Sequence, residues 1–204
     1  MKRFGMAPAR RCALLAALLA TQLFAGCAPL MLGGAVVGGM MAADRRTSGA
    51  QLEDQSIELK ATNRISGIVG ERGHVNVTSY NRMVLVTGEV ATDADKAAVE
   101  QAVGQIENVR SIVNELAVMA PATLGSRSND VVLTSKVKAS LIDAKDLQAN
   151  AFKVVTERGQ VFLMGRVTER EANRASDVAR SISGVQKVIR VFEIVTEAQL
   201  AAMK

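Results

Sequence analysis

The sequence predicts an α+β protein built from two tandem modules, each with the element order α-β-β-α-β. The chain matches itself at an offset of 76 or 77 residues, so that residues 54–116 correspond to residues 130–192. Both copies show helical and strand periodicities in the same order. Apolar residues make up 49% of the chain and aromatic residues only 3%, so we expect cores of Val, Ile, Leu and Ala.

The N-terminus is typical of an export and attachment signal. The basic stretch MKRFGMAPARR precedes CALLAALLATQLF, an apolar stretch too short to span a bilayer comfortably. LFAGC then resembles the bacterial lipobox, with Phe24 in place of the commoner Leu. In that motif the cysteine is acylated, palmitate being one such group, so Cys27 is the predicted lipid anchor. An ordinary signal peptide or an uncleaved anchor is the alternative.

Residue 28 is Ala rather than the Asp of inner-membrane retention signals, which favours the periplasmic leaflet of the outer membrane. Cys12 is predicted to leave with the signal peptide and Cys27 to be acylated, so no disulfide is expected. The chain carries a net charge of +5. Most of this charge comes from the signal peptide, so basicity alone does not indicate a nucleic-acid partner.

The first element of each module is a predicted helix. Within 54–65 and 130–141, apolar residues recur at i, i+4 and i+8, which places them on one face. That face is expected to pack on the core: Ile57, Ala61 and Ile65 in the first copy, and Leu133, Val137 and Leu141 in the second. Asp54 and Asp130 are predicted N-caps, because Asp accepts hydrogen bonds from free N–H groups at a helix start.

Two alternating, β-branched segments follow in each copy, joined by a tight turn at Asn81-Arg82 or at Arg158-Gly159. A second helix and a final strand, at about 110–118 or 187–195, complete the module. The second helices carry apolar residues at helical spacing, which are Val99, Ala102, Val103 and Ile106, and Ala175, Val178, Ala179 and Ile182. This order predicts a small mixed sheet with two helices on one face.

VTERGQVFLMGRVTEREA (155–172) and SGVQKV (183–188) resemble BON domains, and RRTSGAQLED and RSND are similar to the dual-BON outer-membrane lipoproteins. The Gly-Val pair typical of the family is present at Gly184-Val185 but reads Asn108-Val109 in the first copy. The resemblance covers residues 27–196. It implies a periplasmic, non-enzymatic protein that binds anionic phospholipid through its second module and supports envelope integrity, often at the division site.

The chain is accordingly divided into six predicted parts. They are a signal peptide (1–26), a lipidated flexible tether (27–51), BON domain 1 (52–118), a linker with Pro, Gly and Ser (119–127), BON domain 2 (128–196) and a C-terminal tail (197–204).

The first helix of the second module carries the candidate lipid-binding face. Positions pointing away from the core are polar in the first copy (Gln55, Ser56, Asn63 and Ser66) but largely apolar and lysine-edged in the second. An interfacial contact with an anionic membrane requires such a face. The predicted phospholipid-binding residues are Val131, Val132, Ser135, Lys136, Lys138, Ala139 and Ile142.

Two further observations bear on this face. Residues 51–118 carry a net charge of −4 and residues 127–197 a net charge of +3, so only the second module suits an anionic bilayer. Family members can carry Trp where this chain has Val132, and Val inserts less apolar area. The alternative is that the face packs against the first module or the tether.

The sequence does not favour an enzyme, a metal site or a nucleic-acid partner. His74 is the only histidine and is predicted to be structural or solvent-exposed. Glu169 and Glu171 open a helix, where carboxylates complement its dipole. Tyr80 and the five phenylalanines form no stacking platform, and no cofactor is predicted. The alternative function is a protein-interaction or chaperone-like factor that acts on outer-membrane assembly or division proteins.

Overall fold

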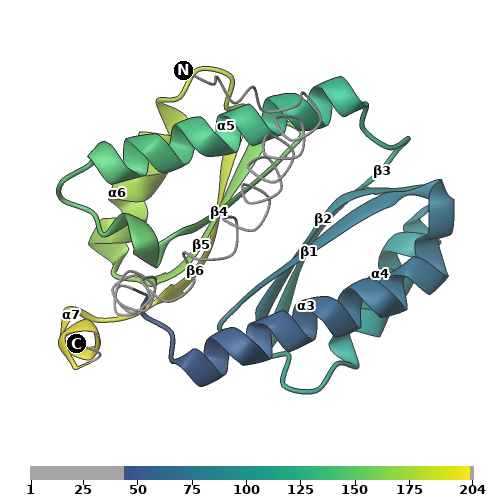
Figure 1. Cartoon of the computed structure of the whole chain (residues 1–204), viewed down its shortest axis with the longest axis horizontal. Helices are drawn as coiled ribbons and strands as arrows, with labels where there is room; N and C mark the ends of the chain where they lie inside the picture. Colours follow the sequence, from purple (N-terminus) through teal and green to yellow (C-terminus); the bar gives the residue numbers. More distant parts are fainter. Residues whose placement is uncertain (1–43, 203–204) are drawn as a thin grey trace, which may run out of the picture. The chain divides into compact units, whose positions relative to one another are not determined.

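A computed structural model of the chain describes residues 44–202 (Figure 1). The predicted signal peptide, Cys27 and the predicted tether as far as residue 43 lie outside the described residues. The described residues group into one compact unit, within which two α-β-β-α-β modules follow one another. The predicted fold class is therefore confirmed.

The elements of both modules occur in the predicted order. In each three-stranded sheet, the second strand of the hairpin is the middle strand. That strand pairs antiparallel with the strand before it and parallel with the last strand. The first module consists of α3 (Ser48–Val69), β1 (His74–Tyr80), β2 (Met83–Val90), α4 (Asp93–Gly104) and β3 (Ser111–Val118). The second consists of α5 (Leu124–Asp143), β4 (Lys153–Glu157), β5 (Gln160–Val167), α6 (Glu169–Arg180) and β6 (Lys187–Ile194). Two 3₁₀ turns, η2 (Gly70–Arg72) and η3 (Ala149–Ala151), precede β1 and β4, and a short helix, α7 (Glu197–Ala201), follows β6.

Helices α3 and α5 begin well before the residues that were predicted to cap them. Their N-caps are Thr47 and Thr123, whose hydroxyl oxygens accept hydrogen bonds from backbone N–H groups in the first turn. The prediction of Asp54 and Asp130 as N-caps is wrong, because both lie inside their helices and are buried. Helix α5 also starts within the segment assigned to the linker. The six-part division of the chain stays a prediction.

Asp54 and Asp130 bind the hairpin turns instead. The carboxylate of Asp54 accepts hydrogen bonds from both backbone N–H groups of Asn81-Arg82, at 2.7 Å. That of Asp130 accepts both from Arg158-Gly159, at 2.8 Å. All four turn residues have φ between 50° and 70°, as a type I′ turn requires. Three of the four are not glycine, and a positive φ is unfavourable for a residue with a Cβ atom. The hydrogen bonds to the buried carboxylates offset this cost.

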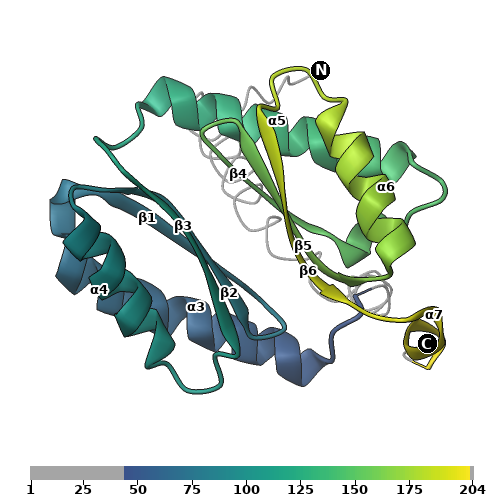
Figure 2. The same cartoon turned by 180° about the vertical axis from the view of Figure 1, so that it is seen from behind.

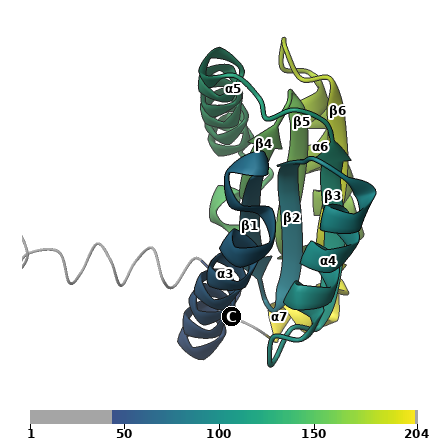
Figure 3. The ribbon, with the colours of Figure 1, turned by 90° about the vertical axis from the view of Figure 1, so that its right-hand side faces the viewer.

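Each module has its own core between its sheet and its two helices, which lie on the same face of that sheet (Figures 1 and 2). Within the modules, α3 lies beside β1 and α5 beside β4 (Figure 3). The helix faces predicted from periodicity supply these cores. Their buried members include Ile57, Ala61, Ile65, Val84, Val86, Val99 and Val103 in the first module, and Val137, Leu141, Val161, Leu163, Ala175 and Ala179 in the second.

The second face of each sheet is apolar too, and these two faces pack against each other. Successive residues of the middle strands alternate between the cores: Val161 and Leu163 face the helices, whereas Phe162 and Met164 face the other module. The shared cluster consists of Tyr80, Leu85, Phe162, Met164 and Val191, with Met83, Val113, Val155 and Ile189 packed around it. The modules are therefore docked sheet to sheet, an arrangement that was not predicted.

Two consecutive arginines before α3 connect the modules. Arg45 donates to both carboxylate oxygens of Glu171, at 2.7 and 2.8 Å, in the second module. Arg46 donates to Asp54 at 2.8 Å, and its guanidinium lies 4.2 Å from the centre of the Tyr80 ring. Residues 44–51 were assigned to a flexible tether. In the structure they contain Arg45 and Arg46, whose contacts with the two modules we call the clasp, and the first turn of α3.

We expect Arg45→Ala to lower the free energy of unfolding by about 3 kcal/mol at neutral pH, because it leaves a buried carboxylate without its cation. The side chains of Arg45 and Glu171 are only 7% and 5% exposed. Arg45 holds the pKa of Glu171 below its ordinary value. The pair therefore stabilises the fold above the ordinary pKa of glutamate, and this contribution is lost as the pH falls through the lowered pKa.

Urea denaturation of wild type and of Arg45→Ala, at pH 7 and at pH 3, measures this effect. The difference in the free energy of unfolding between the two proteins should be smaller at pH 3. The control is Arg180→Ala, because Arg180 pairs with Asp177 on the surface. That change should cost less than about 0.5 kcal/mol. Equal unfolding midpoints for wild type and Arg45→Ala at pH 7 would contradict the role of the clasp.

Candidate lipid-binding face

All seven residues predicted to bind phospholipid lie at exposed positions of α5. Val131, Val132 and Ile142 are 66%, 49% and 68% exposed and lie on the same side of the helix, so they form an apolar patch rather than single exposed side chains. Ser135, Lys136, Lys138 and Ala139 are exposed as well. The structure thus brings the predicted residues together on one side of one helix, opposite the buried core stripe.

The two lysines edge this face on opposite sides. Lys136 and Lys138 are two positions apart, which is about 200° around a helix. Ala139 and Ile142 lie between them on the outer surface. Neither lysine belongs to a salt bridge among the residues that the structure describes. Both ammonium groups are therefore available to an anionic partner.

The apolar contact between the modules is made by their sheets and not by this face. The shared cluster contains residues of β1 to β6 and none of α5. The alternative in which the apolar stripe packs against the first module therefore differs from the structure.

Helix α3 exposes apolar side chains that the comparison of the two copies missed. Leu52 and Leu59 are 68% and 65% exposed. Their spacing of seven residues places them on the outward side of the helix, and this spacing was the available signal. Lys60 is the basic residue beside Leu59, and Glu53 and Glu58 lie on the same helix. The first module is therefore less polar on this side than predicted, but it lacks a pair of flanking lysines.

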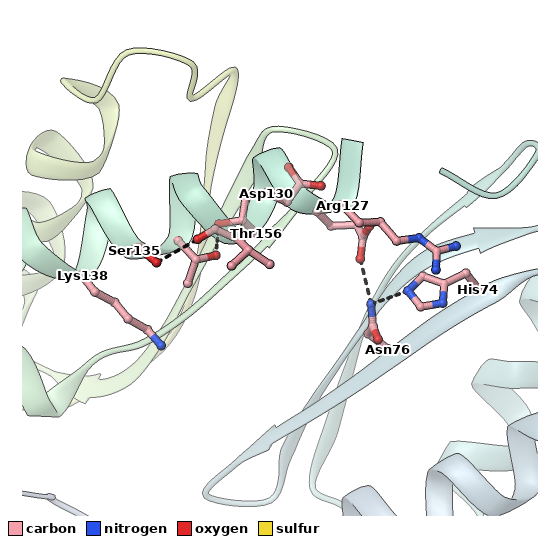
Figure 4. Close-up of a pocket in the computed structure, with 10 residues that line it drawn as sticks. His74, Asn76, Arg127, Asp130, Ser135, Lys138 and Thr156 are labelled. Atoms are coloured by element: carbon pink, nitrogen blue, oxygen red, sulfur yellow. Dashed lines mark hydrogen bonds between the residues drawn. The ribbon is translucent and has the colours of Figure 1, made fainter. Parts of the chain in front are cut away.

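A groove of about 360 Å³ runs along one flank of α5 (Figure 4). One wall belongs to α5, and the other to β4 and to β1 of the first module. His74, which was expected to be structural or exposed, is half-buried at this wall, 3.1 Å from the Asn76 amide. The lining residues are His74, Asn76, Arg127, Asp130, Val131, Thr134, Ser135, Lys138, Thr156 and Glu157. The sequence indicated neither the groove nor a role for Arg127 and Asn76.

Glu157 is the most unusual titratable group of this groove. Burial raises its pKa, and the nearby carboxylates of Glu89 and Asp130 raise it as well. The amide of Asn76 donates to Oε2 of Glu157 at 3.1 Å and opposes the shift. The groove therefore has a polar floor whose negative charge is only partly compensated.

Other predicted residues have structural partners. Glu169 and Glu171 lie in the first turn of α6, where Glu171 completes a capping box with Thr168.

Within residues 44–202 there is no cluster of His, Cys, Asp or Glu suited to a metal ion. None of the described helices combines the length and the hydropathy needed to cross a bilayer.

Comparison with known proteins identifies the family. The BON domain matches residues 54–120 and 129–196, which cover both modules. This chain belongs to the BON-domain family. Over 190 residues it is 36% identical to the outer membrane lipoprotein DolP of Haemophilus influenzae, covering 92% of this chain and 97% of DolP. Over 154 residues it is 32% identical to the 21 kDa hemolysin of Actinobacillus pleuropneumoniae, covering 74% of this chain and 79% of that protein.

The predicted resemblance to dual-BON lipoproteins is thereby confirmed, and the chain is a DolP-like outer-membrane lipoprotein with two BON domains. DolP is named as a lipoprotein and not as an enzyme. The residue assignments on α5 are not decided by this relationship and stay predictions.

We expect Val132→Asp and Ile142→Asp to change the free energy of unfolding by less than about 0.5 kcal/mol, because both side chains already face solvent. Leu133→Asp on the same helix is the matched contrast. It places a charge in a buried site and should unfold the second module or destabilise it by several kcal/mol. Thermal denaturation followed by circular dichroism measures all three. A large destabilisation by Ile142→Asp would mean that another part of the chain covers this face.

Proposed function

We propose that this BON-domain lipoprotein binds anionic phospholipid through the exposed face of α5 and in this way supports envelope integrity, including at the division site. In this proposal Cys27 anchors the protein in the periplasmic leaflet of the outer membrane, and the protein has no enzymatic activity. The observation that carries the proposal is the exposure of Val131, Val132 and Ile142 between two unpaired lysines.

The magnitudes support a weak, reversible contact. Inserting an aliphatic side chain of this size is worth about 1–2 kcal/mol, and only part of each is newly buried. A basic residue near an anionic surface adds about 1 kcal/mol. Three such side chains and two lysines therefore supply roughly 4–6 kcal/mol before ordering costs. A lipid anchor in the same chain raises the local concentration of the membrane, so a contact of this size suffices.

The two modules differ in the way that this function requires. The first module carries a net charge of −4 and the second a net charge of +3. Because like charges repel, an anionic surface favours the approach of the second module. The exposed leucines of α3 have no flanking pair of lysines. They favour a second candidate function, contact with an apolar surface on an outer-membrane assembly or division protein.

Changes on α5 should weaken membrane binding while sparing the fold. We expect Val132→Asp to reduce binding to vesicles that contain phosphatidylglycerol by about tenfold or more. Lys136→Glu combined with Lys138→Glu should have its largest effect at low ionic strength, since salt already screens part of the attraction. Val132→Trp should strengthen binding, because indole prefers the membrane interface. Co-sedimentation of the chain from residue 28 onward with vesicles measures these effects.

Matched changes on α3 provide the control for these variants. Ser56 and Lys60 occupy the positions that correspond to Val132 and Lys136. Ser56→Asp and Lys60→Glu should leave vesicle binding unchanged. Equal losses from changes on α3 and α5, or equal binding to neutral and anionic vesicles, would contradict the proposal.

The anchor is tested separately in cells. We expect the full-length protein to fractionate with the outer membrane and to carry an acylated N-terminal Cys27. Cys27→Ala should abolish acylation and release the protein from membranes washed with carbonate, since the face on α5 alone gives only weak attachment. Mass spectrometry of the mature N-terminus gives a direct readout. A Cys27→Ala form that still matures and resists the wash would refute the anchor.

A further inference from the structure

The internal repeat makes the two sides of the module interface comparable. Strands β1 and β4 correspond to each other, as do helices α3 and α5. Asn76 of β1 corresponds to Lys153 of β4, and Glu58 of α3 corresponds to Thr134 of α5. The line along which α3 meets the second module, and the line along which α5 meets the first, are therefore built from equivalent positions. We call each line a seam. The two seams carry different residues at these positions.

On the α3 side an ion pair closes the seam. Nζ of Lys153 donates to Oε1 of Glu58 at 2.9 Å and to the carbonyl oxygen of Ser79 at 3.2 Å. The same Glu58 oxygen also accepts from the backbone N–H of Ser79 at 2.7 Å. A side chain of the second module thus fills the space beside α3.

On the α5 side the seam is open. Thr134 is short, and its hydroxyl is held by Thr156 at 2.7 Å. Asn76 is shorter than the lysine at its counterpart and is held by Glu157. The space that an ion pair fills beside α3 is left here as the groove of about 360 Å³.

Two cations of this groove lack a salt-bridge partner among the described residues. Arg127 and Lys138 belong to no salt bridge among the described residues, and Nε of Arg127 is buried without a hydrogen-bond partner. Figure 4 shows Arg127 and His74 at one end of the groove and Lys138 at the other. The two cations are separated by eleven positions on α5, or about 16 Å along its axis, so a single small anion cannot contact both.

The acids of the groove do not neutralise Arg127. Both oxygens of Asp130 accept hydrogen bonds from the Arg158-Gly159 turn. Glu157 accepts from Asn76 through one oxygen and has capacity for another donor. The end near Arg127 therefore suits an anion, and the floor suits a group that donates hydrogen bonds.

We propose that this groove binds the phosphodiester headgroup of a phospholipid, with its phosphate at Arg127 and His74 and its hydroxyl-bearing substituent toward Glu157. The proposal rests on the proposed function and adds that the first module takes part, through His74 and Asn76 of β1. A guanidinium beside further donors is a strong phosphate site. Soluble phosphate esters share this chemistry.

The position of the groove favours a lipid as the source of the phosphate. Val131, Ser135 and Lys138 line the groove and also belong to the exposed face of α5. A phospholipid whose chains remain beside that face can therefore place its headgroup in the groove. Lys136 lies on the opposite flank and contacts only the bilayer surface in this arrangement.

The test uses the chain from residue 28 onward, which contains the whole compact unit. The probes are glycerol 1-phosphate, followed by amide chemical shifts, and phosphatidylcholine vesicles with or without phosphatidylglycerol. Asn76→Lys combined with Thr134→Glu copies the closed seam of α3 and leaves the net charge unchanged. Arg127→Gln removes the anion partner without filling the groove. Lys145→Gln removes the same charge at an exposed position outside both the groove and the predicted lipid-binding face.

We expect glycerol 1-phosphate to shift the amides of His74, Asn76 and Arg127. Both groove variants should weaken this binding about tenfold, and Lys145→Gln should not. Thermal denaturation confirms that the variants are folded, and Arg127→Gln decides the test if the double variant is not. Competition between glycerol 1-phosphate and anionic vesicles supports a lipid headgroup as the ligand. Binding without competition supports the phosphate site but overturns the lipid as its source.

Two results separate this inference from the proposed function. If both groove variants bind anionic vesicles as wild type does, while Val132→Asp does not, the headgroup site is refuted and the lipid-binding face stands. If wild type binds no anionic vesicles, the proposed function fails, and the titration with glycerol 1-phosphate alone decides whether the groove binds phosphate. Absence of shifts at His74, Asn76 and Arg127 would refute it.

Discussion

Each three-stranded sheet of this chain carries apolar side chains on both faces, and the need to bury both faces constrains the rest of the structure. Two helices cover one face of each sheet. Residues such as Leu85, Phe162 and Met164 on the other face can leave water only by packing against a second sheet. Because the sheets cover each other, the outer side of α5 remains free, and β1 lies close enough to β4 to exchange hydrogen bonds.

Polar contacts then fix what the apolar contacts bring together. Apolar packing is non-directional, so it alone does not select one register between two sheets. Arg45 and Arg46 bind one module each, and Arg158 donates to the carbonyl of Gly88 across the interface at 2.7 Å. These charges are largely buried and lose stabilisation if the sheets slide. Arg45 and Arg46, which follow the segment predicted to carry the lipid anchor, are thus also part of the interface.

The sequence predicted what depends on neighbours along the chain and missed what depends on distant residues. Helical periodicity placed the stripe of Leu133, Val137 and Leu141 in the core and the opposite residues in solvent, as observed. The docked sheets had a signal, the uninterrupted apolar run VFLM, since strands buried on both faces read as continuous apolar segments. The errors at Asp54 and Asp130 arose because a local capping rule was applied to carboxylates whose partners lie in the hairpin turns.

Duplication explains why one helix carries a candidate site and its copy does not. Both copies need the buried aspartate, the turn and the core stripe, and both retain them. Positions at the seams carry no such requirement, so Glu58 and Lys153 can lock one seam while Thr134 and Asn76 leave the other open. The pair of Lys153 and Glu58 adds a polar contact between the modules at one seam, and no equivalent pair forms at the other among the described residues. At the open seam Arg127 and Lys138 belong to no salt bridge among the described residues, so both cations remain available to a ligand.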